Sequence, residues 1–152
     1  MGLFDIFKKK SKPEKTPEKA PEKTPEKTPE KTLPPEALKW NKMWDMWSDG
    51  QIESPYQDLM TYQSEVNNGG HSQFFFNVDN TGDVNAVVKE NMSILPEVHK
   101  HNLEEAYSAY KKYNDVDDDK MDEILDNCDD VFYENEELII KVLEKYVETI
   151  EL

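Results

Sequence analysis

Residues 65 to 77 read Glu-Val-Asn-Asn-Gly-Gly-His-Ser-Gln-Phe-Phe-Phe-Asn, and the fold of the chain is organised around them. Apolar residues at helical spacing precede this stretch: Tyr56, Leu59, Met60 and Val66. Gly69 and Gly70 then permit the positive φ of a helix C-terminal cap, which residues with a Cβ atom resist. We expect one helix to end there and a second to begin at once. The three phenylalanines of residues 74 to 76 cannot share one helical face, so the second helix should be nearly surrounded by other elements.

The string E-V-N-N-G-G-x-x-Q-F-F-F-N resembles the signature E-V-x-N-G-G-x-x-Q-F-F-x-N of the DNA-mimic protein family (the DMP type). These are small, acidic, all-helical bacterial proteins whose characterised member is a DNA mimic. The position after the two glycines is usually aromatic in that family, and here it is His71. The resemblance extends from about Trp40 to the C-terminus through helix order and acidity. It assigns these motif residues to the fold: Glu65, Asn67, Asn68, Gly69, Gly70, Gln73, Phe74, Phe75 and Asn77.

Three segments are predicted along the chain. Residues 1–12 place a few apolar residues ahead of a lysine triplet, as a short apolar and basic peptide. Residues 13–33 repeat Pro-Glu-Lys-Thr, and proline at every fourth position blocks a helix, so a disordered, extended linker is expected. Residues 34–152 should form one compact all-α domain of about six or seven helices. The sequence leaves the purpose of the first two segments open.

The helices of this domain are predicted from apolar stripes at spacings of three and four. Asp83 should cap a helix after a turn at residues 78–83, and Asn135 should cap the last helix. The stripes that follow the motif are Val84, Val87, Val88 and Met92, then Leu103, Ala106, Tyr107 and Tyr110, then Met121, Ile124, Leu125, Cys128 and Phe132, then Leu138, Ile139, Val142, Leu143, Tyr146, Val147 and Ile150. An aromatic stripe, Trp40, Met43, Trp44 and Trp47, precedes it and is expected in the core.

Charge divides the chain after Lys39. The first part has 10 lysines against 7 acidic residues, a net charge of +3, and the rest has 8 against 26, a net charge of -18. Such a negative domain repels nucleic acid and anionic membranes, so we expect a basic protein as partner, with no direct nucleic acid binding and no stable membrane association. The lone Cys128 excludes an internal disulfide, and no signal peptide or membrane span is visible, which favours the cytoplasm.

The densest acidic run lies between Asp115 and Asp130, where nine carboxylates face the single Lys120, a net charge of -8. Sixteen residues of helix rise about 24 Å. Duplex DNA carries roughly 14 phosphates over that length, and a partner contacts about half of them, so the charge densities are comparable. We therefore predict a partner-binding acidic surface made of Asp117, Asp118, Asp119, Asp122, Glu123, Asp126, Asp129, Asp130 and Glu134.

The sequence favours neither a metal site nor a catalytic site. The acidic run departs from an EF-hand loop because Lys120 replaces the required glycine and Asp126 the bidentate glutamate. His99 and His101 are two residues apart, so they do not face each other on a helix. No HExxH, phosphate-binding glycine loop, nucleophile elbow or Cys/His pairing is present. We expect a protein that is not an enzyme, with no metal, cofactor or catalytic residue.

The favoured hypothesis is an acidic binding protein that resembles DNA mimics and occupies the DNA-binding site of a basic partner such as a transcriptional regulator. Three alternatives remain open. One is an immunity-type protein that neutralises a basic toxin nuclease. The others are an enzyme with a pocket among His71, Glu65 and the tyrosines, and an acidic helical domain whose charge serves only solubility. The sequence does not distinguish a monomer from a dimer.

Overall fold

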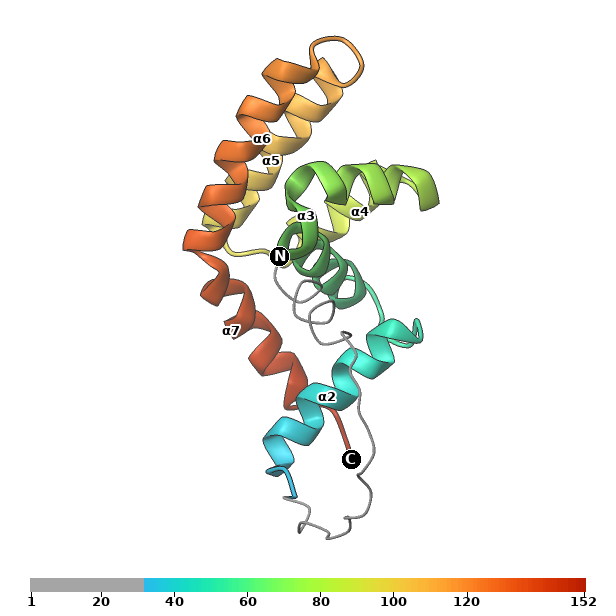
Figure 1. Cartoon of the computed structure of the whole chain (residues 1–152). Coiled ribbons are helices and arrows are strands. Elements are labelled where there is room, and N and C mark those ends of the chain that lie inside the picture. The colour runs from blue at the N-terminus through green and yellow to red at the C-terminus, as the bar shows by residue number, and fades with distance from the viewer. Residues whose placement is uncertain (1–31) are drawn as a thin grey trace, which may run out of the picture. The chain divides into compact units, whose positions relative to one another are not determined.

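A computed structural model describes residues 32–152, and in these residues every regular element is an α-helix (Figure 1). The expected all-α fold of six or seven helices is confirmed. The six helices are α2 (Pro35–Ser48), α3 (Tyr56–Thr81), α4 (Val84–Met92), α5 (Glu97–Tyr113), α6 (Asp118–Glu134) and α7 (Glu136–Val147). The predicted N-terminal peptide and nearly all of the repeat linker lie outside the described residues. Residues Pro35–Leu152 form one compact unit.

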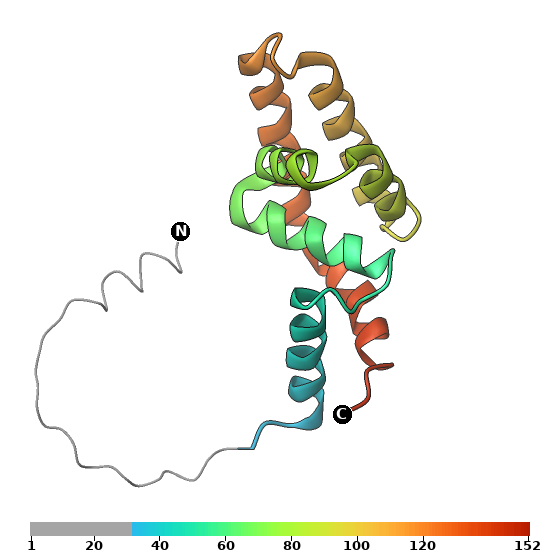
Figure 2. The ribbon, with the colours of Figure 1, turned by 90° about the vertical axis from the view of Figure 1, so that its right-hand side faces the viewer.

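Two antiparallel pairs of helices, the bent central helix α3 and the short helix α4 make up this unit. Helices α5 and α6 lie side by side as a long hairpin (Figure 1, Figure 2), while α2 and α7 meet at the opposite end of the unit. The bent α3 contacts both α4 and α6, so it joins the hairpin to the remaining helices. Among the described residues, no helix combines the length and the apolarity that crossing a bilayer requires.

The bend of α3 occurs at the two glycines. Gly69 has φ -162° and ψ 20°, and Gly70 has φ 79° and ψ -179°, so neither continues the helix. The chain resumes helical geometry directly after them. The expected pair of helices separated by glycines is therefore present, in the form of one kinked element. Because Gly70 has positive φ, it occupies a backbone region that residues with a Cβ atom rarely adopt.

The core draws on every helix, and much of its aromatic part lies where α3 meets α5 and α6. Phe74 and Phe75 are fully buried, and the Phe75 ring stacks on Tyr110 with centroids 4.7 Å apart. Phe76, however, is 65% exposed, so the expectation that all three phenylalanines are surrounded is wrong. Successive residues of a helix point in different directions, and burying the first two leaves the third on the outer face. The aromatic stripe of α2 is mixed, with Met43 buried and its tryptophans half-buried.

Helix ends follow the predicted caps only in part. The Asp83 side chain accepts a hydrogen bond from the Ala86 N–H, at 3.3 Å, which confirms it as the cap of α4. The turn before it is shorter than predicted because α3 continues to Thr81. Asn135 is the N-cap residue of α7, as predicted, but its side chain makes no capping hydrogen bond there. Its Nδ2 instead donates to the Val131 carbonyl, at 2.9 Å, and so serves the end of α6.

Candidate protein-interaction surface

Eight of the nine residues predicted as a partner-binding surface are exposed along α6 and at its N-cap. We call these eight residues the acidic face, and they are Asp117, Asp118, Asp119, Asp122, Glu123, Asp126, Asp130 and Glu134. The buried side of the same helix is the predicted stripe that contains Leu125, Cys128 and Phe132. That stripe fixes the rotation of α6, and the eight residues of the acidic face lie on its outer side.

Little positive charge offsets the acidic face. Lys120 Nζ lies 3.9 Å from the Glu123 carboxylate, and that is the only ion pair among the described residues that involves this face. Asp117 has a local role, since its side chain accepts a hydrogen bond from the Lys120 N–H at 3.1 Å and caps α6. Asp118 likewise accepts from the Asp115 N–H at 3.1 Å. The carboxylates further along α6 are solvated and uncompensated within residues 32–152.

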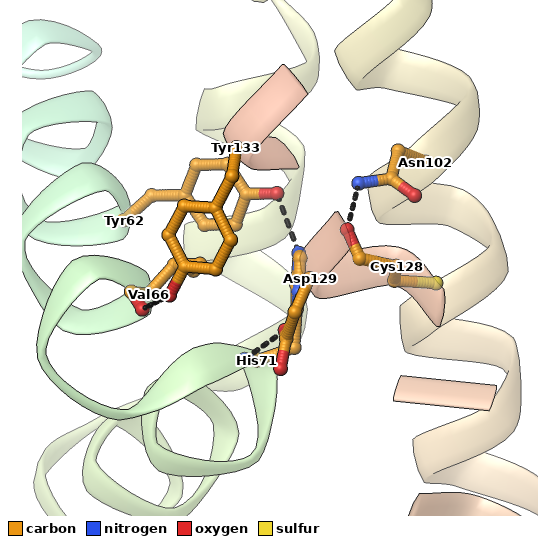
Figure 3. Close-up of polar contacts among 7 residues, drawn as sticks. All are labelled: Tyr62, Val66, His71, Asn102, Cys128, Asp129 and Tyr133. Carbon is orange, nitrogen blue, oxygen red and sulfur yellow. Dashed lines mark hydrogen bonds and ion pairs between the residues drawn. The ribbon is translucent and has the colours of Figure 1, made fainter. Parts of the chain in front are cut away.

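The ninth predicted residue, Asp129, does not belong to this face. Its side chain is only 20% exposed and points toward the α3 bend (Figure 3). One carboxylate oxygen, Oδ1, lies 2.8 Å from the His71 backbone N and 2.7 Å from His71 Nδ1. Asp129 therefore ties α6 to α3, and a partner would not meet a free carboxylate there.

His71 is the centre of this link. It is fully buried, and its Nε2 lies 2.7 Å from the hydroxyl of Tyr62, which is fully buried as well. The ring can donate through Nδ1 to Asp129 and accept at Nε2 from the Tyr62 hydroxyl, so that both ring nitrogens are paired. Burial raises the pKa of Tyr62 well above its usual value, so this hydroxyl stays protonated and available as a donor. Figure 3 shows the three residues linked by hydrogen bonds between α3 and α6.

Further contacts join the motif to α6 and α7. The Tyr133 hydroxyl donates to the Val66 carbonyl at 2.7 Å, where the first half of α3 ends (Figure 3). The side-chain amides of Asn67 and Gln63 both donate to Glu136 Oε2, at 2.6 and 2.9 Å. Figure 3 also shows Asn102 of α5, whose Nδ2 donates to the Cys128 carbonyl at 2.8 Å.

The motif also closes on itself across the glycines. Glu65 Oε1 accepts hydrogen bonds from Gln73 Nε2 and Asn77 Nδ2, both at 2.8 Å. One carboxylate before the bend thus holds two amides after it. Asn68, by contrast, is exposed at the bend. The polar motif residues fix the angle of α3 and, through their contacts with Glu136, the position of the α6–α7 junction.

The two histidines of α5 differ in their exposure to solvent. His99 is fully buried, with Nε2 2.8 Å from the Asn135 carbonyl oxygen, and burial lowers its pKa. His101 is exposed and lies 3.7 Å from a Glu97 oxygen. Within residues 32–152, no three His, Cys, Asp or Glu side chains are arranged to hold a metal ion.

Residues 32–152 therefore form a small, acidic, all-helical unit with its densest run of acidic residues on one helix. The chain belongs to the DMP19-like protein family, whose family model matches residues 56–150. This match contains the motif and helices α3 to α7, and it leaves α2 outside. Searches of curated proteins and of solved structures gave no match.

Proposed function

We propose that this protein binds a basic partner, such as a transcriptional regulator, by presenting the acidic face in the place of DNA. The observation that carries the proposal is the run of exposed carboxylates on α6 with one lysine among them. Membership of the DMP19-like family supports it at the level of the family.

Charge spacing is the physical basis of the proposal. Helix α6 has 17 residues, which corresponds to a length of about 26 Å. Duplex DNA of that length carries roughly 15 phosphates, of which one side presents about half. The acidic face offers eight carboxylates over the same distance. A lysine- and arginine-lined DNA-binding groove would meet a similar linear density of negative charge on either ligand.

DNA mimicry also requires a rigid surface, because a flexible array of carboxylates would lose conformational entropy on binding. Helix α6 is held by its apolar stripe, by Asp129 on His71 and by Tyr133 on the Val66 carbonyl. The motif thereby supports the acidic face without being part of it.

The test is capture from host lysate by the immobilised full chain, with elution along a salt gradient. The variant Asp122→Asn, Asp126→Asn, Asp130→Asn, Glu134→Gln neutralises the acidic face and leaves Asp129 bonded to His71. A control variant, Glu90→Gln, Glu104→Gln, Glu137→Gln, Glu144→Gln, removes the same net charge from exposed positions on α4, α5 and α7. Circular dichroism of both variants checks that the helices are retained.

We expect the wild type and the control variant to capture a basic DNA-binding protein. The acidic-face variant should not capture it, and duplex DNA should displace it from the wild type. Equal loss in both variants would show that net charge alone matters and would contradict the role of α6. A partner that resists high salt and is not displaced by DNA would contradict DNA mimicry and point to an immunity-type complex with a buried interface.

A further inference from the structure

A cavity of about 270 Å³ lies beside the acidic face, between the second half of α3 and the α5–α6 hairpin. Sites for small-molecule ligands usually measure about 300 to 1,000 Å³. This cavity is smaller, and its size suits a single side chain. The residues that matter in its lining are Phe76, Asp79, Tyr110, Asp115, Met121 and Leu125.

An exposed aromatic ring stands in the wall of this cavity. Phe76 is 65% exposed although its two neighbours are fully buried. Leaving a phenylalanine in water forgoes the free energy of burying it, and aromatic residues are enriched where proteins bind one another. Tyr110, also in the lining, is held in place by stacking on Phe75 at 4.7 Å. The cavity thus has an aromatic wall with one fixed ring and one exposed ring.

Two carboxylates lie in the same lining. Asp79 accepts a hydrogen bond from the Tyr110 hydroxyl at 2.7 Å, and burial together with this bond raises the pKa of Tyr110 to about 12. Asp115 belongs to the loop between α5 and α6. Within residues 32–152, neither carboxylate has an ion-pair partner. Met121 and Leu125, both buried, supply an apolar floor from the inner side of α6.

We propose that this cavity receives an arginine side chain of the basic partner. An arginine brings an apolar stem for the floor, a planar cation that stacks on Phe76, and N–H donors for the two carboxylates. Lysine would satisfy the carboxylates but gains less from the flat aromatic face. The proposal rests on the proposed function, and it adds an anchor point whose chemistry is more selective than that of the acidic face.

The test measures binding of the full chain to two peptides of equal length and charge, one alternating glycine with arginine and the other glycine with lysine. Isothermal titration calorimetry compares wild type with Phe76→Leu, which keeps an apolar side chain but has no ring. Phe76→Tyr restores the ring, and Asp126→Asn removes one charge from the acidic face outside the cavity lining. Because Phe76 is mostly exposed, these variants should fold, as thermal melts would verify.

We expect wild type and Phe76→Tyr to prefer the arginine peptide by roughly three- to thirtyfold. Phe76→Leu should abolish this preference, while Asp126→Asn should weaken both peptides alike. Equal affinity of the wild type for the two peptides, or a preference that survives Phe76→Leu, would overturn the proposal. Neither result bears on DNA mimicry, which the α6 variant and DNA displacement test separately. Conversely, failed capture of a partner with an intact arginine preference would contradict mimicry alone.

Discussion

Gly70 meets two separate requirements at the bend of α3, and both exclude a side chain. Its φ of 79° combines with a ψ of -179°, a region that is almost exclusive to glycine. A Cβ atom at this position would also collide with the carboxylate of Asp129. The bond that fixes α6 to His71 thus depends on the absence of one carbon atom.

We predict that Gly70→Ala lowers the free energy of unfolding by about 1 to 3 kcal/mol from backbone strain alone. Displacement of Asp129 from His71 should add to this loss. The measurement is urea denaturation followed by circular dichroism. Gly82→Ala is the matched control, because Gly82 is extended and open space surrounds its missing Cβ. Similar denaturation midpoints for the two variants would refute this account of Gly70.

The buried His99 is expected to make the stability of the fold depend on pH. Burial lowers its pKa in the folded state, so the folded protein binds this proton less readily than the unfolded chain does. The contribution of neutral His99 is therefore complete above the unfolded pKa near 6.5 and declines as the pH falls toward the folded pKa. Its Nδ1 has no hydrogen-bond partner within residues 32–152, so a proton added there would be unpaired.

We predict that unfolding free energy decreases as the pH falls below about 6.5, and that His99→Gln reduces this dependence. Comparing each variant with wild type over the same pH series separates His99 from the many exposed carboxylates that also titrate. His101→Gln is the control, because that ring is exposed. A wild-type slope that persists in His99→Gln would mean that another group is responsible.

At the scale of elements, the two sides of α6 have opposite effects on its stability. The inner stripe anchors the helix, while the acidic face places like charges three and four residues apart. Each such pair costs about 0.2 to 0.5 kcal/mol. Residues that are kept for binding often lower the stability of the folded protein.

We predict that the variant Asp122→Asn, Asp126→Asn, Asp130→Asn, Glu134→Gln melts at a higher temperature than wild type at low salt. Four like-charge pairs four residues apart are relieved, from Asp118–Asp122 to Asp130–Glu134, for a gain of about 1 to 2 kcal/mol. The difference should vanish in high salt, because these charges are exposed and screened. A lower melting temperature for the variant would indicate that these side chains stabilise the fold instead.

The elements themselves could be predicted from the sequence because each helix repeats apolar residues at a regular spacing. The glycine break and the Asp83 cap were equally local signals. Periodicity does not tell which neighbour covers which side of a helix. It therefore fails at Phe76, which no element of residues 32–152 covers.

The prediction for Asp129 is wrong for a related reason. Its charge groups it with the exposed acids, yet it lies four residues after Leu125 and three before Phe132, on the flank of the inner stripe. Two signals in the sequence point to the buried link between Asp129 and His71. One is this position of Asp129, and the other is a histidine where the family that the motif resembles usually has an aromatic residue. The cavity at Phe76 had no such signal, since its lining comes from three helices and a loop that only the tertiary structure brings together.

For the whole molecule, the net charge of -18 after Lys39 dominates long-range behaviour. A field of this kind accelerates encounter with a basic partner, and it is screened over about 10 Å at 0.1 M salt and about 3 Å at 1 M.

We therefore predict that the association rate constant with the captured partner falls by roughly tenfold or more from low to high salt, while the dissociation rate changes much less. Surface plasmon resonance with the partner immobilised would measure both constants. A salt dependence confined to dissociation would contradict steering by the domain's charge.

All three tryptophans of the chain, Trp40, Trp44 and Trp47, lie in α2, the helix that the family match leaves out. Trp47 donates from its indole to the Thr61 hydroxyl at 3.0 Å, and its ring meets Trp44 edge to face. Tryptophan fluorescence, excited selectively over the seven tyrosines, therefore reports only on the surroundings of α2, whereas far-ultraviolet dichroism averages over every helix. The chain carries its own optical probe of whether α2 melts together with the other helices or before them.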